Sequence, residues 1–188
     1  MKEKYNCLKR NSFVDGEFKI RPISIDDIEQ IRIWRNIQMQ ILRQKKIISS
    51  SEQINYFNNT LLPSFNHENP SQIIFSYFKD EVLIGYGGLV HISWDDKRSE
   101  MSFLLNPKLV NVENIYEEYF TKFIDFMKEV NFSILDFHKL FTETYSHRSF
   151  HISILEKAGF ELEGILRDHI NIEKKYFHSL IHSIIKNV

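Results

Sequence analysis

Three strand-like runs follow one another between Gln72 and Leu105, and they constrain the fold more than any other feature of the chain. The runs are rich in β-branched, aromatic and other apolar residues and cover Gln72–Phe78, Val82–Ser93 and Arg98–Leu105. The polar turns between them, Lys79–Glu81 and Trp94–Lys97, are too short for a parallel crossover. Pro107 ends the third run because proline cannot donate to a strand ladder. The sequence therefore predicts three strands that pair antiparallel.

Helix and strand patterns on either side of these runs complete a mixed order. Strand patterns cover residues 17–23, 139–145, 160–169 and 175–185, and helix patterns cover 27–36, 50–61, 112–130 and 148–158. In the longest helix, apolar residues such as Ile115, Tyr119 and Phe123 recur at spacings of three and four. Gly159 is placed to end the last helix.

The fold class that follows is mixed α/β (α+β). We expect a central, largely antiparallel twisted sheet of about six to seven strands, flanked by about four helices. Residues 17–188 are predicted to form a single domain. Residues 1–16 are polar, and we expect a leader or a strand added late to a sheet edge.

Charge and composition exclude several classes of function. Lys and Arg number 24 against 25 Asp and Glu, so no basic excess exists to bind nucleic acid. The single cysteine, Cys7, excludes an intramolecular disulfide and a cysteine-based zinc site. No apolar run approaches the roughly 20 residues that span a bilayer, and Met1–Arg10 lacks the apolar core of a signal peptide. We expect a cytoplasmic protein with no nucleic-acid or membrane partner, and exposed strand edges are compatible with a homodimer.

Two pairs of histidines have a spacing that could bind a metal. His147 and His151 lie four residues apart on a predicted helix, and His178 and His182 share that spacing on a predicted strand. No acidic third ligand stands out near either pair, so we predict no metal.

The glycines are unevenly distributed. Only six occur in the chain, and none lies between Leu89 and Ala158. Any function that needs a glycine-rich phosphate loop in that stretch must do without it.

The order of elements is similar to the GNAT acyl-CoA N-acyltransferase fold, and short sequence motifs strengthen the resemblance. Residues 83–89 (LIGYGGL) resemble a strand motif of the family, and residues 155–164 (LEKAGFELEG) resemble its lEk.GF..eG signature. Residues 18–23 (FKIRPI), followed by 26–28 (DDI) and 33–36 (IWRN), resemble the opening of the RimJ/RimL branch and of bacterial aminosugar N-acetyltransferases. The resemblance covers roughly residues 17–185.

This resemblance implies transfer of an acetyl group from acetyl-CoA to an amine. In this family the fourth strand and the start of the next helix hold the cofactor, which implies a site at Phe103, Leu104, Leu105, Lys108, Asn111, Val112 and Asn114. Arg148 and His151, at the start of the following helix, match family positions that also border the cofactor. Arg148 could contact a phosphate or be an ordinary surface charge.

The stretch expected to bind the pyrophosphate departs from the family pattern. Residues 106–114 (NPKLVNVEN) contain no glycine and one acidic residue, Glu113. Backbone amides at a helix N-terminus bind anions with or without glycine, so we expect acetyl-CoA binding to be retained. The alternative is a rebuilt loop that binds CoA weakly or not at all.

Four residues are candidates for the proton transfers. The resemblance implies that Glu100 is a general base, and the alternative is an ion pair with Arg98 or Lys97. His91 is a second candidate base or a structural histidine. Glu143 and Tyr145 end the strand that splays from the Glu100 strand in this fold, and Glu143 faces either the slot or the opposite side.

The family's usual leaving-group acid is a tyrosine five residues before the Phe of the signature, which here is Leu155. Tyr145, His151 or solvent could replace that acid.

The first helix borders the acceptor pocket in this fold, which implies roles for Trp34, Arg35 and Asn36. Trp34 could stack on a sugar or base, or belong to the core. Our first expectation for the acceptor is an amino-deoxysugar nucleotide of surface-glycan synthesis. The alternatives are a protein N-terminus or a polyamine, or a degenerate GNAT-fold module that binds a ligand without transfer.

Overall fold

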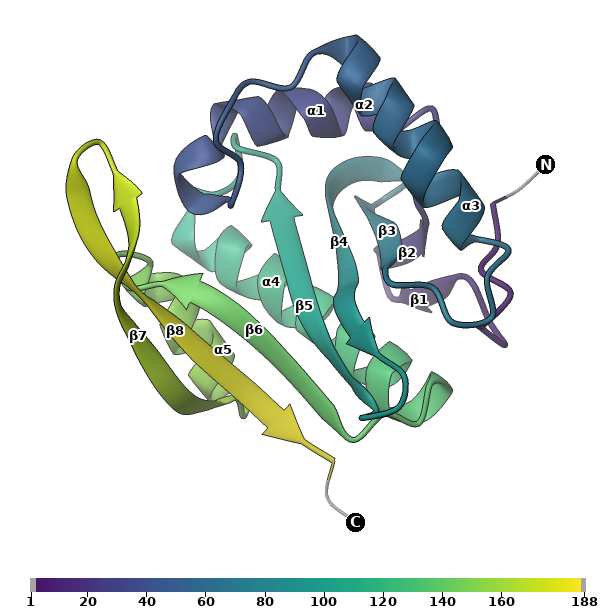
Figure 1. Cartoon of the computed structure of the whole chain (residues 1–188). Helices are drawn as coiled ribbons and strands as arrows, with labels where there is room; N and C mark the ends of the chain where they lie inside the picture. The colour runs from purple at the N-terminus through teal and green to yellow at the C-terminus, as the bar shows by residue number, and fades with distance from the viewer. Residues whose placement is uncertain (1–2, 187–188) are drawn as a thin grey trace.

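An open sheet of eight strands forms the centre of the computed structural model, which describes residues 3–186 (Figure 1). The strands are β1 (Phe13–Asp15), β2 (Phe18–Pro22), β3 (Ile73–Lys79), β4 (Val82–Ser93), β5 (Arg98–Leu105), β6 (Lys139–Tyr145), β7 (Glu161–Ile172) and β8 (Lys175–Ile185). They lie in the order β1-β2-β3-β4-β5-β6-β8-β7. Neighbours pair antiparallel except β5 and β6, which are parallel. The predicted fold class, a mixed α/β GNAT fold, is confirmed.

Five helices cover the two faces of the sheet: α1 (Ile28–Ile37), α2 (Ser50–Tyr56), α3 (Leu62–Ser64), α4 (Glu113–Lys128) and α5 (Ser149–Lys157). α2 passes through a π-helical turn into α3, so the helical segment extends past the predicted end at residue 61 and includes Pro63. The Phe103 ring on β5 stacks on Phe120 of α4. Tyr86 on β4 contacts Arg35 of α1 on the other face. Within residues 3–186, no helix is long and apolar enough to cross a membrane.

The sheet has eight strands rather than the expected six to seven because β1 adds an edge strand, the second of the two expectations for residues 1–16. β1 pairs with β2 at the sheet edge, and Phe13 is buried. Tyr5 is also buried, and its hydroxyl accepts a hydrogen bond of 2.8 Å from the Ile74 amide. The polar composition of residues 1–16 hides these scattered aromatic anchors, which join the same core as the rest of the domain.

The buried face of α4 matches the predicted one at Phe123, Phe126 and Met127 and differs at the start of the helix. Tyr116, Phe120, Phe123 and Ile124 are buried, whereas Tyr119 is only half-buried. Apolar residues occur in adjacent pairs along α4 and widen the apolar face of the helix. Spacing alone therefore does not show which residues lie at the centre of that face.

The feature that positions the functional site is the divergence of β5 from β6. They pair only at Arg98–Glu100 with Lys139–Phe141, and beyond Glu100 the two strands separate. In Figure 1 the upper ends of β5 and β6 point apart, with α4 behind the gap. The separation leaves an opening in the sheet that side chains from α1, α4 and α5 line.

Candidate functional site

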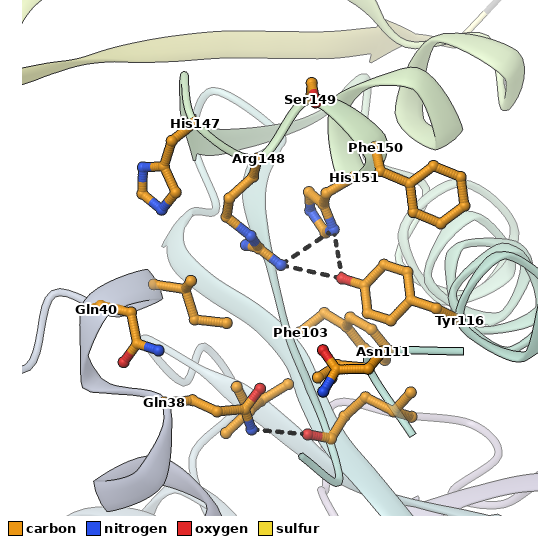
Figure 2. Close-up of a pocket in the computed structure, with 14 residues that line it drawn as sticks. Gln38, Gln40, Phe103, Asn111, Tyr116, His147, Arg148, Ser149, Phe150 and His151 are labelled. Atoms are coloured by element: carbon orange, nitrogen blue, oxygen red, sulfur yellow. Dashed lines mark hydrogen bonds between the residues drawn. The ribbon is translucent and has the colours of Figure 1, made fainter. Parts of the chain in front are cut away.

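A cavity of about 400 Å³ occupies the opening beyond β5 (Figure 2). Its walls are the end of β5, the start of α4, the start of α5 and the turn after α1. The lining includes Phe103, Leu104, Leu105, Asn111, Arg148 and His151, all expected from the sequence to contact the cofactor. We call this space the donor cavity.

The start of α4, beside the donor cavity, has the properties of an anion site. No side chain caps the helix, whose N-cap residue is Val112. The backbone N–H groups of Glu113, Asn114 and Ile115 have no hydrogen-bond partner within residues 3–186. Three free amides and the positive end of the helix dipole favour a phosphate. The residues present therefore fit the pyrophosphate of acetyl-CoA without a glycine-rich loop. The negative charge of the Glu113 carboxylate repels the pyrophosphate and weakens this fit.

Three polar side chains meet on the wall of the donor cavity, as Figure 2 shows. Arg148 Nη2 lies 3.0 Å from the Tyr116 hydroxyl and 3.3 Å from His151 Nδ1, and the hydroxyl lies 2.7 Å from Nδ1. Arginine has only donors, so the Tyr116 oxygen accepts from it, and a proton on His151 Nδ1 would face Arg148 as a second donor. The Tyr116 hydroxyl therefore donates to His151 Nδ1, and the imidazole is protonated at Nε2. We call this group the Tyr116 triangle.

His151 is buried and stays neutral. It stacks on the Phe120 ring at 4.1 Å between centroids. Burial holds the pKa of His151 well below its usual value, and the charges of Arg148 and His182 lower it further. Because the unfolded chain binds a proton at this residue near its ordinary pKa and the folded chain does not, stability falls as pH drops below about 6.5.

We expect His151→Gln to remove part of this pH dependence. The wild type should lose stability between neutral pH and about pH 5, and the variant should show a smaller slope over that range. Urea denaturation at a series of pH values measures it. Equal slopes in the two proteins would mean that His151 is protonated in the fold. His138→Gln is the control, because that side chain is exposed and outside the cavity.

A second cavity of about 190 Å³ opens from the first and contains the two candidate carboxylates. Ile41, Phe103, Leu104, Arg148 and His151 line both cavities, and we call this shared wall the junction. Glu100, Glu143 and Tyr145 line only the second, which we call the acceptor cavity.

Glu100 and Glu143 converge on one cation, Arg43. Arg43 Nη2 donates to Glu100 Oε1 at 2.8 Å and also to Glu143 Oε2. Glu100 is 6% exposed, so its carboxylate has little contact with water. The predicted pairing of Glu100 with Arg98 or Lys97 does not occur, because both of those side chains bind aspartates of neighbouring turns.

His91 reaches Glu100 from the outer side. Its Nδ1 lies 2.7 Å from Glu100 Oε2, while the side chain is 63% exposed. A bulge in β4 places it there, since His91 has a φ of 47° and the register with β5 shifts between Val90 and Ser93. His91 therefore links the buried carboxylate to solvent and does not line the acceptor cavity.

Glu143 faces the acceptor cavity and is ionised. The Ser179 hydroxyl donates to its Oε1 at 2.6 Å. Burial raises the pKa of Glu143, but the bonds from Ser179 and Arg43 and the charge of Arg43 outweigh burial and hold it below its usual value. Burial and the neighbouring Glu143 charge raise the pKa of Tyr145. The Tyr145 hydroxyl has no hydrogen-bond partner in the described part of the chain.

A third cavity, of about 390 Å³, extends the acceptor cavity under α1 and α2. Arg35, Tyr86 and Ser102 line both spaces. The remaining walls are mostly apolar, with Ile23, Ile31, Tyr56, Ile74 and Val90 among them. Arg35 donates to the Tyr86 hydroxyl and, at 3.1 Å, to Gln44 Oε1. No carboxylate of residues 3–186 pairs with it.

Several predicted site residues lie elsewhere. Trp34 is buried in the core. Asn36 binds the following loop, accepting from the Ile48 amide at 2.9 Å, so it does not reach a cavity wall. The side chains of Lys108, Val112 and Asn114 are exposed outside the donor cavity, because the turn before α4 directs them to solvent. Among the described residues, no group of three His, Cys, Asp or Glu side chains could hold a metal ion.

Two polar side chains of the cavity walls were not among the residues predicted from the sequence. Arg43 lies in the loop between α1 and α2, and no local pattern distinguishes it from its neighbours. Tyr116 belongs to the apolar face of α4, where a tyrosine is normally a core residue. Its hydroxyl becomes significant only beside Arg148 and His151.

Comparison with known proteins gives the following matches. The family model described as an acetyltransferase (GNAT) domain matches residues 20–181. None of the curated proteins compared with the chain matches it in sequence.

Solved structures with the same fold include three of spermidine N-acetyltransferase from Vibrio cholerae. The complex with CoA and spermine is 19% identical, with a TM-score of 0.77 over 91% of this chain and 96% of that one. A dodecameric structure in an intermediate state is 17% identical, with a TM-score of 0.77; the match covers 91% of this chain and 95% of that one. The complex of the spermidine/spermine enzyme with manganese is 19% identical, with a TM-score of 0.75 over 90% and 93%. At these identities the likeness establishes the fold.

Proposed function

The chain belongs to the GNAT acetyltransferase family, and we propose that it acetylates a small primary amine whose ammonium binds between Glu100 and Glu143. Family membership makes it an N-acetyltransferase with acetyl-CoA as the acyl donor, which disfavours the degenerate binding module. It does not single out the RimJ/RimL branch. The identity of the amine is the part that we propose.

The observation that carries the proposal is the pair of carboxylates around Arg43. Two carboxyl side chains, both mostly buried, converge on a single guanidinium in a cavity that opens onto the donor cavity. An ammonium has three donors and the same charge, so it can replace Arg43 without leaving either carboxylate unpaired. Arg43 lies on a loop and is half-exposed, so it can move out.

The proposed mechanism uses the chain's own groups at each position. Acetyl-CoA supplies an acetyl group activated as a thioester. Glu100 accepts a proton from the ammonium, and His91 passes that proton to solvent. Beyond Glu100, β5 has no strand partner on the β6 side, so its N–H groups there can polarise a carbonyl. Glu143 retains its charge and holds the amine in place.

A polyamine is the acceptor class that the comparisons favour over the aminosugar. The structural neighbours act on spermidine, and an acidic pair suits a cationic amine. The amino-deoxysugar nucleotide remains a second candidate because of Arg35. A guanidinium without a carboxylate partner, at the mouth of the third cavity, would attract a phosphate and repel a second ammonium.

Two measurements test this proposal: the binding of acetyl-CoA, and turnover with a panel of three acceptor amines. Acetyl-CoA at 100 times its dissociation constant should stabilise the fold by about 2.7 kcal/mol and raise the melting temperature by about 5–11 °C. Turnover is then measured with spermidine, a nucleotide-linked amino sugar and a peptide with a free N-terminus. We expect spermidine to be acetylated fastest, and Arg35→Gln to leave that rate unchanged or raise it.

Three outcomes would contradict the proposal or part of it. No thermal shift at millimolar acetyl-CoA would refute the enzyme assignment. Turnover of the nucleotide sugar alone, lost in Arg35→Gln, would establish the second candidate. Turnover of the peptide alone would identify a protein N-terminus as the acceptor.

A further inference from the structure

The junction of the donor and acceptor cavities needs an acid, and few groups there can supply a proton. The thioester must lie at the junction, because donor and acceptor meet only there. Arg148 does not lose its proton in proteins, and His151 is a neutral imidazole. Leu155, at the position of the family's usual tyrosine, is fully buried and has no proton to give. Tyr145 lines the acceptor cavity, on the side of the amine, whereas the sulfur leaves toward the donor cavity, which Tyr116 lines.

We propose that Tyr116, on α4, is the general acid that protonates the leaving thiolate. Its hydroxyl lies within 3.0 Å of two side chains of the junction, and its ring lines the donor cavity. This assignment rests on the proposed function. It moves the acid from α5, where the family signature has it, to the facing helix.

The bonds of the step balance. The Tyr116 O–H bond breaks, an S–H bond forms on the departing thiolate, and the electron pair stays on the phenolate oxygen. Arg148 Nη2, already donating to that oxygen, stabilises the negative charge. The C–N bond forms and the C–S bond breaks. The ammonium loses one proton to Glu100 before the attack and a second proton as the C–N bond forms, and the second proton restores the hydroxyl.

The Tyr116 triangle allows the hydroxyl to turn without leaving a buried group unpaired. Because the hydroxyl donates to His151 Nδ1 in the arrangement inferred above, its O–H must rotate to reach sulfur. Arg148 Nη2 lies 3.3 Å from the same Nδ1 and can take over the bond. His151 and Arg148 are thus positioning residues: one holds the proton in the resting site, and the other stabilises the oxygen after transfer.

Tyr116→Phe tests the proposal with little disturbance to the fold. The phenyl ring keeps the contacts with Phe103, Phe120 and Phe150, and Arg148 and His151 remain within reach of each other. Tyr119→Phe is the matched control, since it makes the same change three residues away and outside both cavities. Tyr145→Phe tests the competing acid.

The first readout is binding and needs no acceptor. Affinities of CoA and of desulfo-CoA, which lacks the sulfur atom, are measured by calorimetry from about pH 7 to 10, across the ordinary pKa of a thiol. In the wild type and Tyr119→Phe, the preference for CoA should grow with pH, because the thiolate accepts from Tyr116. In Tyr116→Phe the ratio of CoA affinity to desulfo-CoA affinity should rise about tenfold less over the same pH range.

The second readout is turnover, with spermidine as the probe acceptor. Tyr116→Phe should lower kcat about 100-fold and leave the KM for acetyl-CoA within about twofold. Retention of at least a third of wild-type kcat would overturn the proposal, as would an equal loss confined to Tyr145→Phe. A rise in KM with unchanged kcat would show that Tyr116 only binds the donor, which also overturns it.

Failure of the proposed function is distinguishable from failure of this inference. If the wild type binds CoA but acetylates no amine in the panel, the proposed function fails, and the sulfur-dependent affinity still decides the role of Tyr116. If the wild type does not bind CoA, both are overturned.

Discussion

Glu100→Gln should reduce turnover by two to four orders of magnitude at saturating substrate. Glutamine keeps the shape of the side chain and an acceptor for Arg43, but it cannot take a proton from the ammonium. The rate of CoA release with spermidine or the best acceptor of the panel measures the effect. The acid limb of the pH–rate profile should disappear as well, because that limb reports the base.

The control for this variant is Glu163→Gln on β7. Glu163 binds Lys139 and Ser183 and lines neither the donor nor the acceptor cavity, so its loss should leave turnover within about twofold. If Glu100→Gln retains more than a tenth of the wild-type rate and Glu143→Gln loses 100-fold, the roles of the two carboxylates are exchanged. If neither variant is impaired, the amine does not bind between them.

Gly88→Ala should destabilise the fold by about 3–5 kcal/mol, a large part of the stability of an ordinary domain. Gly88 has a φ of 154°, and a Cβ there would lie 2.0 Å from the Ile73 carbonyl oxygen and 2.9 Å from Ile74 Cα. Both atoms are backbone of β3, so neither can move without breaking the ladder with β4. Urea denaturation followed by circular dichroism measures the loss.

Gly164→Ala is the matched control. No atom lies within 4 Å of a Cβ at Gly164, and its backbone needs no left-handed conformation. We expect a change below about 1 kcal/mol in either direction. A similarly small effect for Gly88→Ala would mean that β3 and β4 can separate there, and that the placement of β4 beside the acceptor cavity is less rigid than described.

Gly88 and Gly164 also show how much a sequence motif says about packing. Both belong to motifs by which the chain resembles its family, yet only Gly88 is required by close packing. A motif in a single sequence therefore identifies the fold without stating which of its residues carry the packing.

Most of the secondary structure could be predicted because it depends on local patterns. The alternation in 72–105 and the turns within it predicted β3, β4 and β5 to within about two residues, and Gly159 ends α5 with a φ of 88°. The structure of the segment before residue 17 could not be predicted from local patterns. Tyr5 and Phe13 are separated by polar residues, and their burial depends on contacts with Phe65 and Phe75, which lie far away in the sequence.

The site was only partly predictable for the same reason. The resemblance placed Glu100, Glu143, Arg148 and His151 near the chemistry, and the structure brings all four to the cavity walls. It could not place Trp34 and Asn36, because a helix bordering a pocket presents only one of its sides to it. Of these three adjacent residues, Arg35 alone faces the cavities.

By itself, the sequence determined the order of strands and helices, the family and the absence of a glycine-rich loop, because periodicity, turn residues and short motifs act over a few neighbours. The tertiary structure decided which side chains contact one another in the cavities. Arg43 meets Glu100 and Glu143 across separations of 57 and 100 residues, and Tyr116 meets His151 across 35. Contacts at such separations depend on how β5 and β6 diverge and how α4 faces α5, which no local pattern specifies.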